Sequence, residues 1–305
     1  MKKKSFAALG LTACALVLGA CGSGTGTKEG GTKVVASFYP LAFVAEEVGG
    51  THVSVDNLTS PGVEPHDLEL KPKQVGSVQD ADLIIFEGHF QAAVDQAVDQ
   101  AGRDDKALVD VADVVKLQPL PEGTEEEGHG RDEHDPHVWL DPVNMIAVTE
   151  AVRAKLSAIN PDHAAVYTKN AAALTAKLKT LDESFSTGLA TCQTSKIVTS
   201  HAAFGYLAKR YGLEQVSIAG IDPSNEPSPA QLADITRLVR KDKITTIFTE
   251  ELVSPAIADT VARETGAKTA TLDPIEGLSD ETADENYLTL MAKNLAVIEK
   301  ANSCS

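Results

Sequence analysis

The sequence has few basic residues for its length. Of 305 residues, 27 are lysine or arginine and 44 are aspartate or glutamate, which gives a formal net charge of −17. Proteins that bind nucleic acid neutralise phosphates with clustered basic side chains, so this balance argues against a nucleic-acid partner. The negative field attracts cations, although a need for solubility explains the charge equally well.

The sequence also lacks, after its first 20 residues, an apolar run long enough to span a bilayer. At the N-terminus, three lysines precede a short apolar stretch that ends in Leu-Gly-Ala-Cys at 18–21. This pattern is typical of a secretory signal. We expect residues 1–20 to be a signal peptide and residues 21–32, rich in glycine and threonine, to be a flexible tether.

Cysteine is scarce, with four residues in the chain, of which Cys14 lies in the expected signal peptide. Cys21 ends a motif that resembles the cleavage site of bacterial lipoproteins, in which this cysteine carries the lipid. The alternative is an ordinary cleaved signal with an incidental cysteine. Outside the cytoplasm a remaining pair is expected to be oxidised, so we predict a disulfide between Cys192 and Cys304, with two buried free thiols as the alternative.

Two series of short β-branched runs alternate with helical patterns. The expected strands are 34–38, 53–58, 83–86 and 107–111, then 196–199, 215–218, 244–249 and 268–272. The expected helices between them are 41–48, 90–101, 202–211, 229–240 and 255–265. Strand, helix and strand in series predict a parallel sheet with helices on its faces. We therefore predict an α/β fold with two lobes, at residues 33–160 and 190–305.

A strongly helical stretch separates the two series. Asp-Pro at 141–142 and Asn-Pro at 160–161 are each typical of a helix start, and the first helix should reach about residue 158. Apolar residues then recur every three or four positions over 167–189, which indicates one buried stripe. At ~1.5 Å per residue a helix over 161–189 would be ~40 Å long. We predict that it is a rigid linking helix along both lobes; an ordinary helix of one lobe is the alternative.

An acidic segment lies at 121–135 and also contains His129 and His134. It has no apolar periodicity, which predicts a loop. Its role could be low-affinity capture of metal, and the alternative is a solvated acidic loop.

Four residues of metal-ligating types occur in a shared context. His66, His201 and Glu276 each follow an expected strand, and His137 lies in a loop that leads to a helix. In open α/β sheets, ligands bind in the crevice outside the carboxyl ends of the strands. Two of the four residues come from each expected lobe, so we predict a site between the lobes.

Three imidazoles and one carboxylate suit zinc in tetrahedral geometry, and they disfavour calcium and magnesium, which prefer oxygen. Imidazole also suits copper, nickel and iron, so ligand type alone does not select zinc. Glu250 and Glu251 end a strand and are candidates to hold the ligating imidazoles. We expect Trp139 to pack in the wall of the site. We expect His52, His89 and His163 to lie on the surface.

The chain resembles a family, the ZnuA-type zinc-binding lipoproteins of bacterial ABC metal importers. The segments that carry the resemblance are Val-Val-Ala-Ser-Phe-Tyr-Pro (34–40), Glu-Pro-His-Asp-Leu-Glu (64–69), Asp-Pro-His-Val-Trp-Leu-Asp-Pro (135–142), Thr-Ser-His-Ala-Ala-Phe-Gly-Tyr-Leu (199–207), Glu-Pro-Ser (226–228) and Leu-Asp-Pro-Ile-Glu-Gly-Leu (272–278). The resemblance implies two lobes joined by a rigid helix, with the metal between them. It assigns ligand roles to His66, His137 and His201.

The resemblance leaves the fourth ligand open, because relatives use a glutamate matching Glu276, an aspartate in the same loop, here Asp273, or water. Manganese-binding relatives have a carboxylate where this chain has His201, which favours zinc. The expected function is capture of Zn(II) as transported ligand by a lipid-anchored monomer, with delivery to an ABC permease in the membrane.

Three other functions are considered. Manganese or iron uptake would use the same architecture. A zinc hydrolase would also use three histidines and a carboxylate, but the chain has no His-Glu-x-x-His helix, and we expect no enzyme. Cell adhesion would suit a surface lipoprotein, and no residue pattern indicates it.

Overall fold

Two four-stranded parallel sheets form the framework of the computed structural model, which describes residues 31–121 and 134–305. The first sheet contains β1 (Thr32–Ala36), β2 (Val53–Asn57), β3 (Leu83–Phe86) and β4 (Leu108–Asp110), in the order β2-β1-β3-β4. The second contains β7 (Lys196–Thr199), β8 (Glu214–Ser217), β9 (Thr246–Thr249) and β10 (Lys268–Thr271), in the order β8-β7-β9-β10. The expected α/β class with two parallel sheets is confirmed.

The two sheets share one topology. In each, the first strand is central, the second pairs on one side of it, and the third and fourth follow on the other side. The chain therefore reverses its direction of winding between β1 and β3, and between β7 and β9. Side chains that follow these strands lie at the position where open α/β sheets bind ligands.

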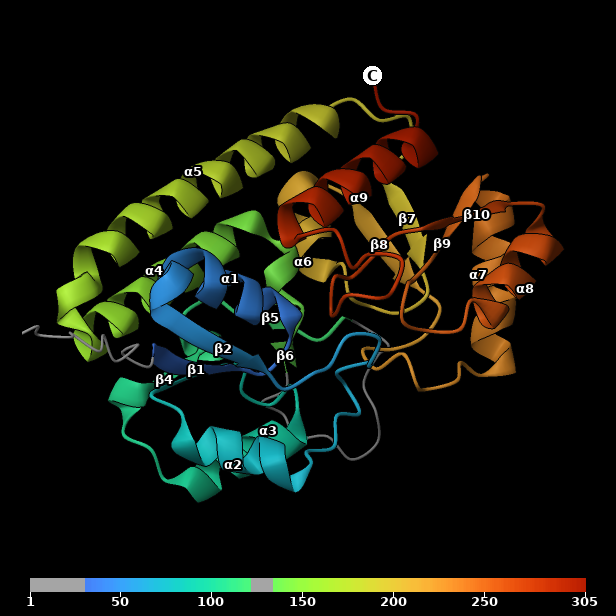
Figure 1. The fold of residues 1–305 in the computed structure, drawn as a ribbon. Coiled ribbons are helices and arrows are strands. Elements are labelled where there is room, and N and C mark those ends of the chain that lie inside the picture. Colours follow the sequence, from blue (N-terminus) through green and yellow to red (C-terminus); the bar gives the residue numbers. More distant parts are fainter. Residues whose placement is uncertain (1–30, 122–133) are drawn as a thin grey trace, which may run out of the picture. The chain divides into compact units, whose positions relative to one another are not determined.

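Helices cover both faces of each sheet (Figure 1). The helices are α1 (Tyr39–Gly49), α2 (Pro72–Asp80), α3 (Ala92–Ala101), α4 (Pro142–Ile159), α5 (Ala164–Gly188), α6 (Gly205–Tyr211), α7 (Pro229–Lys241), α8 (Ala256–Thr265) and α9 (Tyr287–Asn302). A small antiparallel pair, β5 (Gln118–Pro119) and β6 (His134–Asp135), closes the base of the acidic segment.

Successive strand residues pack into different cores, as the pleat of a strand requires. Leu83 and Ile85 point into a large core, whereas Ile84 between them packs with α2 and α3 in a smaller one. The large core continues through α5, with Leu174, into the second sheet, with Phe248. The two sheets therefore share one continuous apolar interior.

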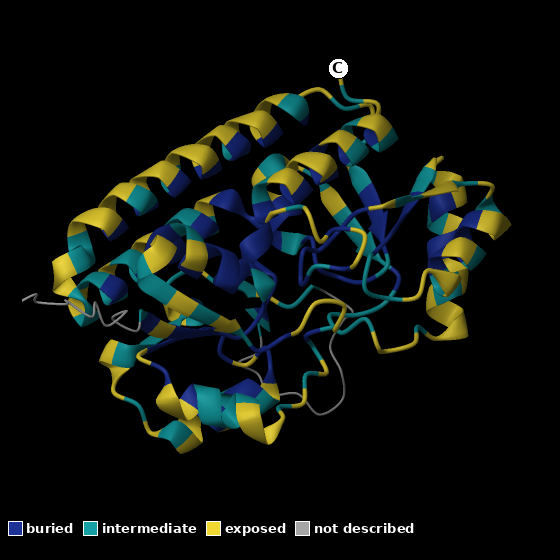
Figure 2. Ribbon diagram, in the orientation of Figure 1, coloured by how far each residue is buried: buried dark blue, intermediate teal, exposed yellow. Residues whose placement is uncertain are grey.

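The linking helix α5 buries one stripe along its length. Its buried residues are Tyr167, Ala171, Leu174, Leu178, Leu181 and Phe185. It contacts α1 and α4 on the side of the first sheet and α9 on the side of the second, and its outer surface is exposed (Figure 2). The long helix predicted from the sequence is confirmed, although its first turn, Pro161–His163, is a 3₁₀ turn.

A disulfide joins Cys192 to Cys304. It lies where the chain leaves α5 and where it leaves α9. Backbone hydrogen bonds from Gln193 to Asn302 and from Ser305 to Thr191 flank it. The C-terminus is therefore fixed beside the start of the second half of the chain.

Three features were not predicted: α2, α9 and the β5–β6 pair. The start of α9 is encoded locally, because the Asn286 side chain accepts hydrogen bonds from the backbone N–H groups of Leu288 and Thr289. Residues 31–305 form one compact unit, so the lobe limits at 33–160 and 190–305 stay predictions. The expected signal peptide, Cys21, His129 and most of the expected tether lie outside the described residues.

Among residues 31–121 and 134–305, no helix combines the length and the apolar character needed to cross a membrane.

The shared core predicts a large stability effect at Leu174, which is fully buried on α5. We expect Leu174→Ala to lower the free energy of unfolding by about 2–5 kcal/mol, because it removes buried methyl groups and leaves a cavity. Denaturant unfolding measures the loss. Lys179→Ala on the exposed side of the same helix is the control, and a loss no larger than in this control would show that α5 is not part of the core.

Candidate metal centre

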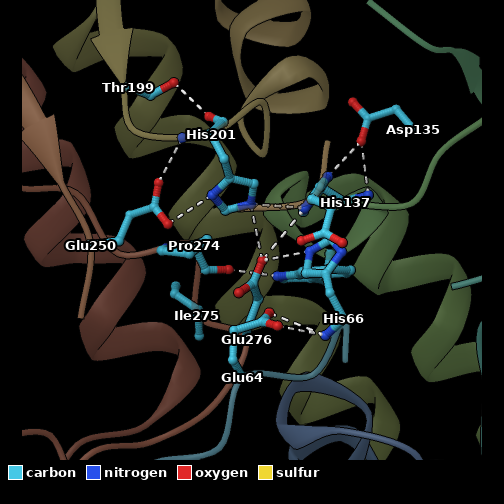
Figure 3. A network of polar contacts seen from close by, with 12 residues as sticks. Glu64, His66, Asp135, His137, Thr199, His201, Glu250, Pro274, Ile275 and Glu276 are labelled. Atoms are coloured by element: carbon cyan, nitrogen blue, oxygen red, sulfur yellow. Dashed lines mark hydrogen bonds and ion pairs between the residues drawn. The ribbon is translucent and has the colours of Figure 1, made fainter. Parts of the chain in front are cut away.

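Four residues from distant parts of the chain meet at one buried point. One nitrogen each from His66, His137 and His201 and one carboxylate oxygen of Glu276 all lie within 4.8 Å of one another. His66 comes from the connection after β2, His137 from the turn before α4, His201 from the end of β7 and Glu276 from the connection after β10. Figure 3 shows the three rings directed at Glu276.

His201 lies at the point where the second sheet reverses its winding. The strand β7 ends at Thr199, two residues before His201. The Glu250 carboxylate, directly after β9, makes two contacts with this histidine. Its Oε1 accepts the backbone N–H of His201 at 3.0 Å, and its Oε2 lies 2.7 Å from Nδ1. Because a carboxylate can only accept, Nδ1 carries a hydrogen, and Nε2 is the atom directed at Glu276.

His137 is held in the same way by Asp135. The Asp135 Oδ1 atom lies 2.8 Å from His137 Nδ1 and accepts its backbone N–H at 3.0 Å. The other carboxylate oxygen packs on Gly205, where an added Cβ would lie 2.4 Å from it. Residue 205 must therefore be glycine for Asp135 to keep this position.

His66 repeats part of this arrangement. Its backbone N–H donates to both carboxylate oxygens of Glu64, at 3.0 and 3.1 Å. Its ring stands edge-on to Phe90, with ring centroids 4.8 Å apart, and 6% of its side chain is exposed. Among the three histidines it is the one with some contact to solvent, since the other two side chains are fully buried.

Glu276 is placed by an unusual turn. Ile275, directly before it, has a φ of 57°, a left-handed conformation that a β-branched residue rarely adopts. Asp273 holds this turn, because its Oδ1 accepts the backbone N–H of Ile275 at 2.7 Å. The Trp139 indole donates to the Pro274 carbonyl at 2.7 Å, which ties the turn to the segment that carries His137.

Four of the six separations among these ligand atoms fit a tetrahedral metal site. Glu276 Oε1 lies 3.5 Å from Nε2 of His66, 3.5 Å from Nε2 of His137 and 3.3 Å from Nε2 of His201. The two Nε2 atoms of His137 and His201 are 3.2 Å apart. Ligands about 2.0–2.2 Å from a zinc ion lie about 3.3–3.6 Å from each other in a tetrahedron. Glu276 Oε1 and His66 Nε2 are also buried without a hydrogen-bond partner among the described residues, as expected of atoms that bind a cation.

The charges of the cluster are strongly coupled. Burial opposes ionisation of Glu276, but the three imidazoles outweigh it and hold the pKa of this carboxyl well below its usual range. Burial likewise opposes protonation of His201, yet Glu250 and Glu276 raise its pKa well above the ordinary value. Asp135 and Glu276 outweigh burial at His137 and raise its pKa, whereas burial lowers the pKa of His66. A cation can replace the protons that balance these carboxylates.

The other candidate residues named from the sequence are not part of the cluster. Asp273 holds the turn and is not a member of the cluster, and Glu250 rather than Glu251 contacts a clustered imidazole. Trp139 is fully buried in the wall of the site. His134 pairs with Glu87, Nε2 to Oε1 at 3.5 Å.

The three histidines expected on the surface differ in exposure. His89 is exposed, as expected, whereas His52 and His163 are half-buried and stack on each other, with ring centroids 3.8 Å apart.

Sequence reasoning missed the positioning roles of Asp135 and Glu64. A signal was present, because both stand in the pattern acid-Pro-His, at 64–66 and 135–137. An acidic side chain can accept the backbone N–H two residues on. The pattern therefore fixes the backbone of each histidine through a contact between residues close in sequence.

Known proteins resemble this chain over most of its length. The model of the family described as zinc-uptake complex component A, periplasmic (ZnuA), matches residues 34–301. The zinc-binding lipoprotein AdcA of Streptococcus pneumoniae is 41% identical over 98% of this chain, and the chain spans 61% of that protein's length. The high-affinity zinc uptake system protein ZnuA of Bacillus subtilis is 36% identical, with 95% of each chain covered.

Among solved structures, the Zn(II)-bound ZnuA-like domain of Streptococcus pneumoniae AdcA matches with a TM-score of 0.76 and 38% identity. The match covers 90% of this chain and 99% of that domain. Sequence and fold thus agree over nearly all of the described residues. The chain belongs to the ZnuA family of zinc-uptake complex components.

Proposed function

We propose that the chain captures Zn(II) outside the cytoplasm through His66, His137, His201 and Glu276 and delivers it to an ABC-type permease. The observation that carries the proposal is the convergence of three Nε2 atoms and one carboxylate oxygen within 4.8 Å. Carboxylates that fix the outer nitrogens of two of the rings support it, because such partners are typical of metal-binding histidines. The names of the zinc-binding relatives agree.

The ligand set favours zinc over manganese and iron. Three imidazoles provide borderline-soft nitrogen ligands, whereas manganese prefers carboxylate and carbonyl oxygen. The set also favours binding over hydrolysis. Three histidines and Glu276 fill the four positions of a tetrahedral ion, while a catalytic zinc keeps one position open for water.

The N-terminus and the family support the rest of the functional assignment. Cys21 carries a lipid that holds the protein at the outer face of the membrane. The protein acts as a monomer that meets its permease by docking. Zinc is its cargo.

A metal competition tests the function and the ligand set together. Zinc, manganese, copper and nickel are offered to the metal-free chain against a calibrated chelator. We expect tight zinc binding at one site and much weaker manganese binding. We expect His201→Ala to lose more than about 100-fold in zinc affinity, since losing a ligand costs more than losing its hydrogen-bond partner.

His163→Ala, which removes a histidine stacked on His52, is the matched control and should leave zinc affinity unchanged. Preferential manganese binding would overturn the metal but keep the transport class. No tight binding of any ion would overturn the function.

The packing of Asp135 on Gly205 gives a second test. We expect Gly205→Ala to lower zinc affinity by about 10–100-fold, because the new Cβ displaces the carboxylate that orients His137. Gly220→Ala is the control, since nothing lies within 4 Å of a Cβ at that position. Equal affinities in the two variants would show that Asp135 does not set the position of His137.

The proton balance of the cluster predicts a pH dependence. In the metal-free protein the pKa of His137 and of His201 is raised, so below those pKa values each ring also carries a proton on Nε2, which zinc must displace. Binding therefore releases protons, and affinity falls as pH falls, by up to about two decades per pH unit if both rings titrate. The fall begins above the ordinary imidazole pKa of 6.5, because the pKa of His201 lies well above it. Chelator competition at several pH values measures it, and a flat profile down to about pH 5 would exclude a histidine site.

A further inference from the structure

The helix α9 carries a buried polar residue in the middle of its apolar face. Asn294 is 2% exposed. It lies on the buried side of the helix, between Met291 and Ile298. Asparagine is a weak helix former, and burial of its amide is unfavourable unless the amide is hydrogen-bonded. Leucine would suit this position better in both respects, so the reason for an asparagine must lie in its contacts.

Both ends of the Asn294 amide bind one residue of the turn that carries Glu276. The amide oxygen accepts the backbone N–H of Asp273 at 2.9 Å, and the amide nitrogen donates to the backbone carbonyl of Asp273 at 2.6 Å. The N–H can only donate and the carbonyl can only accept, so the two contacts also fix the orientation of the amide. One side chain of α9 thereby holds both main-chain polar groups of Asp273.

Asp273 lies where the hydrogen bonding of the second sheet ends. The strand β10 ends at Thr271, and Leu272 still donates its backbone N–H to the Thr249 carbonyl at 2.9 Å. In the part of the chain that the structure describes, no strand extends this ladder to Asp273. Buried backbone groups need partners, and Asn294 supplies both. The side chain therefore takes the place of a neighbouring strand for one residue.

The two residues that follow Asp273 are held as well. Pro274 has no N–H, and its carbonyl accepts a hydrogen bond from the Trp139 indole at 2.7 Å. Ile275 donates its N–H to Asp273 Oδ1 at 2.7 Å. Its φ of 57° persists only where the surroundings impose it, since Ile275 is β-branched. The turn thus depends on Asp273, whose own backbone is held by α9.

This arrangement bears on which carboxylate meets the three histidines. The Asp273 carboxylate is engaged at the Ile275 N–H and is not a member of the cluster, whereas Glu276 is. Glu276 directly follows the left-handed residue, so its direction depends on that conformation. If the backbone of Asp273 were free to shift, Ile275 would relax to a negative φ and Glu276 would leave its place among the imidazoles.

We propose that Asn294 is a positioning residue that makes Glu276 the fourth ligand by fixing the backbone of Asp273. Asn294 does not belong to the cluster and acts through the turn. The inference rests on the proposed function in one respect, because it takes the three histidines and Glu276 as the zinc ligands. It adds that the choice of the fourth ligand is made by the helix α9 rather than by the connection after β10.

The test compares two asparagines of the same helix. Asn294→Leu removes both contacts to Asp273 while keeping the side chain close to its original size. Asn302→Leu is the matched control, because Asn302 is also buried on α9 and also donates to a backbone carbonyl, that of Thr194 at 3.0 Å. That contact lies beside the disulfide and not at the turn. Denaturant unfolding ranks the stability lost by each variant.

Cobalt(II) in place of zinc reports the coordination of the ion through its visible absorption. We expect the wild type and Asn302→Leu to share one spectrum that azide does not change, since four protein ligands fill a tetrahedral ion. We expect Asn294→Leu to give the spectrum of Glu276→Ala and to shift when azide binds at the opened position. Its zinc affinity should fall by about 10–100-fold, the loss typical of a residue that orients a ligand.

A second readout needs no metal. Hydrogen exchange of the Ile275 amide in the metal-free protein, followed by NMR, reports its bond to Asp273 Oδ1. Relative to the amides of β9, we expect this exchange to be about tenfold faster or more in Asn294→Leu and unchanged in Asn302→Leu, because only the first opens the turn locally. If Asn294→Leu does not fold, Asn294→Ser replaces it in both readouts with the same expected direction, since its hydroxyl is too short to reach both groups of Asp273.

Two results would overturn the proposal. If Asn294→Leu keeps the wild-type cobalt spectrum and does not respond to azide, the turn holds itself. If Asn302→Leu changes the spectrum and the Ile275 exchange as much, the effect is a general loss of stability. A wild type that binds neither zinc nor cobalt tightly would instead count against the proposed function, and the exchange of Ile275 would then decide the role of Asn294 alone.

Discussion

The site depends on holding three imidazoles around one carboxylate at a buried point, with Nε2 of each ring turned inward. Two of the rings cannot turn, because Asp135 and Glu250 each bind both the backbone N–H and Nδ1 of the histidine they hold. This double contact fixes the tautomer and the ring orientation in one step. Burying so many charged groups is energetically unfavourable. Bound protons offset this when the metal is absent, and the ion offsets it when the metal is present.

The surrounding fold keeps these groups at a constant separation. The apolar interior runs from the first sheet through α5 into the second, and α5 contacts helices of both halves. The Trp139 indole and the Tyr287 hydroxyl add polar ties, because the first donates to Pro274 and the second donates to the Trp139 carbonyl at 2.6 Å. An interior shared in this way resists a wide hinge opening, since opening would expose apolar surface. Exchange of the ion is therefore expected to involve connections such as the one that carries His66.

Much of the fold was predictable because it is encoded locally. The strands at 83–86 and 196–199 were placed to the residue, since short β-branched runs there are bounded by polar residues. The β5–β6 pair was missed because its strands are two residues long and carry no periodicity. The first turn of the linking helix also differs from the predicted α-helix, because a proline at a helix start does not distinguish a 3₁₀ turn from an α-helical one.

At the site, the four clustered residues could be named from the sequence because strand ends gather at one edge of a parallel sheet. The choice between Glu276 and Asp273 could not be made in advance, because it depends on a left-handed residue, Ile275, between them.

The disulfide has a consequence for resistance to proteolysis. Because it joins residues 112 positions apart, everything between Cys192 and Cys304 is a covalently closed loop. A protease that cuts one exposed connection within this loop, such as the one before α7, releases no fragment. The disulfide still links the two pieces of the cut chain. Glu276 and His201 both lie inside the loop. Half of the metal ligands are thus protected against loss by a single cleavage, whatever happens to the connection that is cut.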